Sequence, residues 1–202
     1  MGLFNFRKKK EDNNKSHVQR YMDYLDSVFK QEPIFIQGEK KGEDALPGVT
    51  VMIYKNVPEE GFITGITYGL SLANHPEWKH GRPELCISVA SSDESWATVA
   101  AYIANRLRGD CPFSYGQVIN FGQQISEESD MDAFFIFAPS TLDKESYFNI
   151  DIGAEYKISI AGLYPIYSEE LETFNKIGLE KFWHHPDFDN YAVNRNKIIV
   201  AE

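Results

Sequence analysis

The 202-residue sequence has little or none of several features that would identify a function at once. It contains only two cysteines, Cys86 and Cys111, and no apolar run of roughly 18 residues, so it predicts neither a disulfide framework nor a transmembrane helix. No GxxxxGK[ST] or GxGxxG motif occurs, which excludes the common phosphate-cradling loops. An apolar export segment is also missing near the start. We therefore expect reduced cysteines and a cytoplasmic protein.

Positive charge is scarce as well. Lysine and arginine total 20 against 30 aspartates and glutamates, which gives a net charge of −10. The basic stretch 7–10 supplies +4, so residues 11–202 carry −14. We interpret residues 1–15 as a basic flexible tail and residues 16–202 as one domain. So acidic a body repels phosphate backbones and argues against nucleic-acid partners, and we expect no membrane partner either. It serves solubility, or it favours a basic protein partner.

The sequence does contain clear apolar periodicity. Val18, Tyr21 and Leu25 recur at spacings of three and four and predict a helix over residues 16–30. Alternating or continuous apolar runs bounded by turn residues predict strands. These strands span residues 34–36, 49–54, 62–68, 85–90, 117–121, 133–137 and 156–163.

Two further helices have start and stop signals. Ser91 and Glu94 have the spacing of a capping box for a helix that Gly109 ends. Ser168 can cap a last helix with carboxylates in its first turns, and Gly178 weakens that helix or ends its first part. Together the elements predict an α+β fold of the α/β type, in which helices flank a mixed or mostly antiparallel sheet.

One stretch near the end of the chain suggests metal chemistry. His184, His185, Asp187 and Asp189 place two imidazoles and two carboxylates within six residues, and these donors suit zinc or another transition metal. Adjacent histidines on regular structure point in different directions, however, and a helix end followed by a turn is the simpler interpretation. We predict no catalytic, cofactor or metal site, and keep a metal-dependent hydrolase as an alternative.

Two groups of carboxylates are candidates for contact with a basic partner. The preferred group lies on a predicted loop, where binding residues are common, and has no evident local use. The other group begins the last helix, where the helix dipole already explains it. The two groups are Glu127, Glu128, Asp130 and Asp132 on the loop, and Glu169 and Glu170 on the helix.

The stretch between the third and fourth predicted strands combines unusual polar residues with a core-strand pattern. Gly69 permits an unusual backbone turn after a strand. Arg82 and Glu84 flank Pro83, so their side chains can point to one side of an extended segment. We interpret them as a structural ion pair at the start of a core strand and not as a catalytic couple.

These residues carry a resemblance to a known family. Tyr68-Gly69-Leu70-Ser71 followed by Gly81-Arg82-Pro83-Glu84-Leu85 resembles the suppressor of fused domain family, especially its bacterial members. The resemblance covers roughly residues 18–185. Its later motifs are Asp93-Glu94-Ser95-Trp96, the stretches 113–121 and 162–170, and Gly178-Leu179.

The resemblance implies a non-enzymatic domain that works by binding proteins, with no catalytic residues assigned. It also implies, for a bacterial member, an immunity protein that neutralises a toxin. We therefore expect a basic toxin domain as the partner and no cofactor. A housekeeping interaction or regulatory protein of the same family is the alternative.

Overall fold

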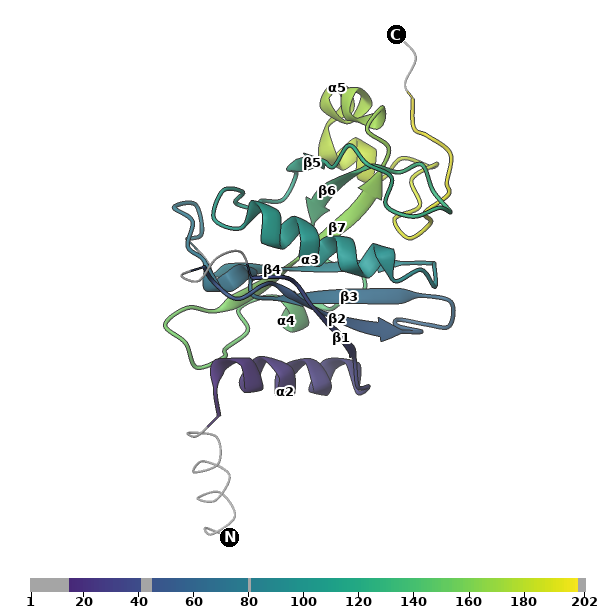
Figure 1. Ribbon diagram of the computed structural model, residues 1–202. Helices are drawn as coiled ribbons and strands as arrows, with labels where there is room; N and C mark the ends of the chain where they lie inside the picture. The colour runs from purple at the N-terminus through teal and green to yellow at the C-terminus, as the bar shows by residue number, and fades with distance from the viewer. Residues whose placement is uncertain (1–14, 41–44, 80, 200–202) are drawn as a thin grey trace.

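The computed structural model describes residues 15–40, 45–79 and 81–199. These residues build a seven-stranded mixed sheet with helices packed on both faces (Figure 1). This architecture confirms the predicted α+β class. The predicted tail, residues 1–15, lies outside the described residues except for Lys15.

Every predicted strand is present. In space the strands follow the order β1-β2-β3-β4-β7-β6-β5, and each neighbouring pair is antiparallel except the central pair β4–β7. β4 begins at Arg82 and not, as predicted, at Leu85. The prediction missed its first residues because they include polar side chains, which do not fit the pattern of a core strand. The strands are β1 (Ile34–Gln37), β2 (Thr50–Lys55), β3 (Ile63–Tyr68), β4 (Arg82–Val89), β5 (Val118–Asn120), β6 (Ala133–Phe137) and β7 (Ile158–Ile166).

Four α-helices lie among the described residues, together with a short 3₁₀ turn. The first helix begins at a capping box between Ser16 and Gln19, and it buries Tyr21 and Leu25, whereas Val18 is exposed. The helices are α2 (His17–Phe29), α3 (Ser95–Leu107), α4 (Lys144–Tyr147) and α5 (Glu170–Trp183), and the 3₁₀ turn η1 is Leu70–Leu72. None of the described helices is long and apolar enough to cross a membrane.

The sheet buries apolar side chains on both faces. Ile158, Ile160, Tyr164 and Ile166 lie an even number of residues apart on β7 and therefore share one face. The first two pack with α2 and the last two with α5, so α2 and α5 cover opposite ends of that face. α3 covers the other face. Cys86 and Cys111 are buried and unpaired within this core.

The contact between α3 and β3 is very close. A Cβ atom on Gly65 would lie 2.8 Å from the Cβ of Ala97, nearer than real Cβ contacts come. Glycine on the strand and alanine on the helix therefore let the helix lie directly on the sheet. This packing places the start of α3 beside the loop that carries the predicted acidic surface.

The start of α3 differs from the prediction. Glu94 is the N-cap residue and makes no side-chain cap, so the expected Ser91–Glu94 capping box is wrong. Ser91 instead accepts a hydrogen bond from the N–H of Asp93, 2.9 Å away, and its hydroxyl donates to Glu128. The Ser91 hydroxyl thus binds a distant carboxylate instead of capping the backbone N–H groups of α3.

The start of α5 differs for a similar reason. Ser168 does not cap the helix, because its N–H and its hydroxyl both donate to Asp132, at 2.7 and 2.9 Å. Gly178 interrupts the helix with non-helical angles (φ 78°, ψ 168°), as the sequence indicated.

Candidate partner-binding site

A buried carboxylate at the start of β4 organises the polar stretch between β3 and β4. Glu84 is fully buried, and its oxygens accept hydrogen bonds from the N–H groups of Gly69 (2.8 Å) and Ser71 (3.0 Å). The hydroxyls of Thr67 (2.6 Å) and Ser71 (2.7 Å) donate to the same carboxylate. Burial raises the pKa of Glu84, and these hydrogen bonds oppose that rise. The carboxylate therefore serves as an internal clamp on the turn.

The same turn is held from its other side by Arg108. Gly69 has φ +125°, and a Cβ there would lie 3.1 Å from the Cα of Val49. Its carbonyl accepts a hydrogen bond from Arg108 Nη1 at 3.0 Å, and the same nitrogen donates to the carbonyl of Pro47 at 2.7 Å. The sequence missed this role, because a basic residue just after a helix is already explained by the helix dipole.

The expected ion pair between Arg82 and Glu84 does not form. Arg82 Nη1 donates to the carbonyl of Ser71 at 3.1 Å, and the guanidinium lies 4.0 Å from the ring centroid of Tyr156. The turn's N–H and hydroxyl groups already satisfy Glu84, so no cation is needed there. Both residues still brace the turn, through different atoms of Ser71.

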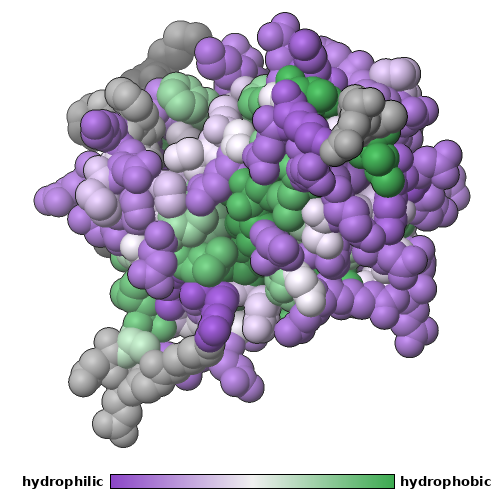
Figure 2. Space-filling view, turned by 90° about the horizontal axis from the view of Figure 1, so that it is seen from above, coloured by the Kyte–Doolittle hydropathy of each residue, from purple (hydrophilic) through white to green (hydrophobic). Residues whose placement is uncertain are grey.

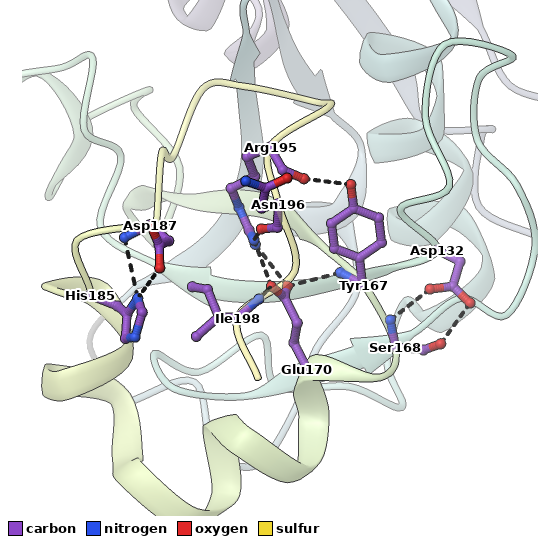
Figure 3. Close-up of polar contacts among 9 residues, drawn as sticks. All are labelled: Asp132, Tyr167, Ser168, Glu170, His185, Asp187, Arg195, Asn196 and Ile198. Carbon is purple, nitrogen blue, oxygen red and sulfur yellow. Dashed lines mark hydrogen bonds and ion pairs between the residues drawn. The ribbon is translucent and has the colours of Figure 1, made fainter. Parts of the chain in front are cut away.

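The structure brings the two predicted acidic groups together (Figure 3). Asp132, at the end of the loop, binds the N–H and hydroxyl of Ser168, directly before α5. Glu128 accepts hydrogen bonds from Ser91 and from the indole N–H of Trp96, the latter at 2.8 Å. The expectation that the loop carboxylates have no local use is therefore wrong for Glu128 and Asp132. Hydroxyl and N–H donors from distant segments, buried at Ser91 and Trp96 and half-buried at Ser168, bind them.

The other two loop carboxylates remain available. Glu127 and Asp130 are exposed, and neither carboxylate makes a hydrogen bond or ion pair within the described part of the chain. They alternate with anchored residues, since Ser126, Ser129 and Met131 are all buried. The loop thus presents two negative charges that have no hydrogen bond or ion pair among the described residues. The hydrogen bond with Glu169 is the main cause of the raised pKa of Lys197, and the charge of Asp130 contributes to it.

Glu170 occupies a different position from the one the sequence suggested. It is fully buried and forms a two-pronged ion pair with Arg195, at 2.6 and 2.8 Å (Figure 3). The N–H groups of Ile198 (2.7 Å) and Tyr167 (3.0 Å) also donate to Glu170. Its place on a helix start indicated an exposed carboxylate, but the C-terminal segment folds over it. Glu170 is therefore inaccessible to a partner in this fold.

Arg195 is the central residue that sequence reasoning missed. It is 25 residues from Glu170 along the chain, in a segment without periodicity, so no local pattern links the two. Its guanidinium also lies 4.8 Å from the ring centroid of Phe188. Glu169, next to Glu170, stays exposed and pairs with Lys197 at 2.7 Å. That contact lowers the pKa of Glu169.

The histidine-rich stretch after α5 forms turns. His185 Nδ1 accepts a hydrogen bond from the N–H of Asp187 at 3.2 Å. Asp189 accepts from the N–H groups of Tyr191 and Ala192, at 2.9 and 3.1 Å. Across the described ranges, no three histidine, cysteine, aspartate or glutamate side chains are grouped so as to hold a metal ion.

Apolar surface is also exposed. Figure 2 shows one face that is mostly hydrophilic around its rim and has hydrophobic residues gathered in its middle. The edge strand β1 exposes Ile34, Phe35 and Ile36, with Phe35 56% exposed. A hollow of about 510 Å³ lies between β1, α3 and residues 121–125. Exposed apolar groups of this kind are common where proteins bind one another.

The buried carboxylates Glu84 and Glu170 are thus used internally, and Glu127 and Asp130 carry charge on the surface. The chain belongs to the Suppressor of fused protein (SUFU) family, whose model matches residues 42–193. No protein with a curated description matches the sequence.

Solved structures share the fold at low sequence identity. A SUFU homologue from Neisseria gonorrhoeae is 18% identical with a TM-score of 0.67, over 91% of this chain and 97% of that one. A Sufu–Fu complex contains a chain that is 14% identical with a TM-score of 0.60, over 91% of each chain. Drosophila Suppressor of Fused is 14% identical with a TM-score of 0.64, over 89% of this chain but 50% of its own length.

The clamp on the turn can be tested by two substitutions. Glu84→Gln directs an amide NH₂ at groups that are themselves donors, and we expect it to lower the free energy of unfolding by about 2–4 kcal/mol. Arg82→Ala removes one hydrogen bond and one cation–π contact and should cost only about 1 kcal/mol. Urea denaturation measures both. A loss for Arg82→Ala as large as that for Glu84→Gln would contradict the assignment of the clamp to Glu84.

The buried ion pair supplies a second prediction. Arg195→Met leaves the Glu170 carboxylate buried without its cation, and we expect a loss of about 3–5 kcal/mol in unfolding free energy. Lys197→Met is the matched control, because its pair with Glu169 is exposed and screened by water, and it should change stability little. Thermal and urea unfolding would refute the assignment if the Arg195 variant matched the control.

Proposed function

We propose that this chain is a non-enzymatic, protein-binding member of the SUFU family that acts as an immunity protein, by covering a basic toxin domain in the cytoplasm. Family membership and the net charge of −14 over residues 11–202 support the proposal. The Sufu–Fu complex is a precedent for partner binding by a protein of this fold. The geometry adds free carboxylates on a rigid loop, which is the observation that carries the choice of surface.

Glu127 and Asp130 are the carboxylates best placed to meet lysine or arginine side chains. Neither gives up a hydrogen bond or ion pair with a described residue when it binds, although the charge of Asp130 already acts on nearby Lys197, whereas Glu169 would first have to leave Lys197. The loop is also preorganised, because Glu128 and Asp132 fasten it to the start of α3 and to the segment before α5. Fixing a loop in advance lowers the entropy lost on binding. The proposed surface is therefore Glu127 and Asp130, with Glu169 at its margin.

A housekeeping interaction or regulatory protein is the other candidate function. It would use the same acidic surface and differ only in the partner. The exposed edge strand β1 favours neither candidate, since both need protein contact. The two candidate functions differ in whether the bound partner is a toxin.

The first experiment looks for the partner among proteins encoded beside this chain. We expect a neighbouring toxin domain to co-purify with the chain, and cells that express the toxin to grow only when the chain is also expressed. A chain that neither binds nor protects against any neighbouring toxin would overturn the immunity proposal. Binding to a harmless neighbour would instead establish the regulatory alternative.

The second experiment tests the acidic surface. The double variant Glu127→Gln and Asp130→Asn should slow association with a basic partner about 3- to 10-fold at low salt and flatten the salt dependence of the rate, with stability unchanged. Asp143→Asn with Glu145→Gln removes the same charge from exposed acids at α4 and is the control. Stopped-flow measurements of the association rate compare the two double variants. An equal effect of both pairs would assign the steering to net charge alone.

A further inference from the structure

A groove lined by aromatic rings lies outside the acidic surface. Its volume is about 580 Å³, and it is formed by four segments that are distant in sequence. These are the stretch before β4, the turn after α3, α4 with the residue that follows it, and the early part of β7. The side chains that give it its character are Trp78, Pro83, Phe113, Tyr115, Tyr147 and Phe148.

The groove is preformed. The indole N–H of Trp78 donates to the carbonyl of Pro112 at 2.9 Å, which ties the first segment to the second. Pro83 sits opposite Ser159 in the parallel pairing of β4 with β7. Phe113 is almost fully buried. A ligand would therefore meet fixed walls and would not have to order them.

The rim of the groove leaves apolar surface in water. Tyr115 is 50% exposed and Phe148 is 39% exposed, although both belong to the groove wall. Tyr115 also packs against Phe137, with ring centroids 5.5 Å apart, which holds its ring in place. Burial raises the pKa of Tyr115 to about 12, so its hydroxyl stays protonated and can donate a hydrogen bond. A fixed, exposed ring with a hydroxyl donor, such as Tyr115, is suited to bind an extended peptide. The backbone carbonyls of such a peptide make no internal hydrogen bonds and can accept one from the hydroxyl.

The residues that line the groove and the hollow beside it carry more positive than negative charge, although the exposed acids Asp143 and Glu145 flank Lys144 on α4. Lys79 and Lys144 line the groove with Glu77. A neighbouring hollow of about 430 Å³ shares Trp78 and Lys79. It adds the charged residues Arg82, Lys157 and Glu155. The charged residues that line the two hollows are thus four cations and two acids, in a chain of net charge −10. A ligand with a negative group is complementary to this region.

We propose that the aromatic groove binds an extended, proline-containing peptide segment that carries an acidic residue. Polyproline II segments have no internal hydrogen bonds and lose little entropy on binding, and aromatic-lined grooves are their usual receptors. Prolines pack against Trp78, Tyr115 and Phe148, and the acidic residue meets Lys79 or Lys144. This inference does not rest on the toxin proposal, since none of the groove residues belongs to the acidic loop.

Three synthetic peptides test the groove on the full chain. The probe has five prolines followed by three aspartates. One comparison peptide replaces the aspartates with lysines, and the other replaces the prolines with glycine and serine. Calorimetric titration should give saturable binding of the probe with Kd below about 1 mM, and binding at least about 10-fold weaker for each comparison peptide. No binding of the probe, or equal binding of either comparison peptide, overturns the proposal.

Substitutions locate the binding. Tyr115→Ala with Phe148→Ala should weaken probe binding at least about 10-fold, because it removes two ring faces. Tyr102→Ala, an exposed tyrosine on α3 outside the groove, is the control and should leave the Kd unchanged. Lys79→Gln with Lys144→Gln should abolish the preference for aspartate over lysine. An equal effect of the control would place the site elsewhere and refute the groove.

A measurement on the unmodified protein tests the same site without substitutions, so its result does not depend on whether a variant folds. The indole N–H resonance of Trp78 should shift as the probe is added, because this ring lines the groove. The resonance of Trp96, buried against Glu128, should stay in place. A shift at Trp96 without one at Trp78 contradicts the proposal.

Discussion

The burial of the Glu84 carboxylate without a cation is the constraint on which the centre of the fold depends. A buried charge is costly unless hydrogen bonds replace its water, and here N–H and hydroxyl groups of one short turn do so. The turn must then hold a fixed shape, which requires a glycine with positive φ at Gly69. Glu84 lies on β4, between β3 and β7, and the hydrogen bond that it accepts from Thr67 ties the end of β3 to the start of β4. Arg108 extends the constraint to α3 through the carbonyl of Gly69.

A second buried carboxylate solves the same problem in another way. Glu170 takes a cation, Arg195, and thereby fastens the C-terminal segment across α5. Both solutions withdraw negative charge from the surface, and internal bonds engage two further carboxylates, Glu128 and Asp132, that stay at least partly exposed. The acidity of the sequence therefore overstates the charge offered to a partner. The proposed binding surface therefore rests on the few carboxylates, such as Glu127, that make no internal hydrogen bond or ion pair in the described part of the chain.

The elements that depend on local pattern could be predicted from the sequence, and the contacts between distant segments could not. The periodicity of Tyr21 and Leu25 predicted α2, and alternating apolar residues predicted the strands. Both could be predicted because burial of one face of an element places apolar residues at regular spacings in the sequence. Ser91 and Ser168 were misjudged because a cap is a local bond, and both found tertiary carboxylates instead. The role of Arg195 could not be predicted from a local pattern, because its partner Glu170 lies 25 residues away in the sequence. The resemblance in the motif around Gly69 and Glu84 succeeded because that motif is itself a contact network.

Charge is segregated over this molecule, and that segregation bears on what a partner must present. The carboxylates of Glu127 and Asp130 attract a basic surface over distances of about a Debye length, roughly 8–10 Å in physiological salt. The lysines beside the aromatic groove act on the same scale and repel that surface. A partner that engaged both regions would need basic and acidic patches at matching positions, which a simple polycation lacks. If both proposed surfaces take part in binding, their opposite local charges disfavour a simple polycation, and specificity then comes from repulsion as well as attraction.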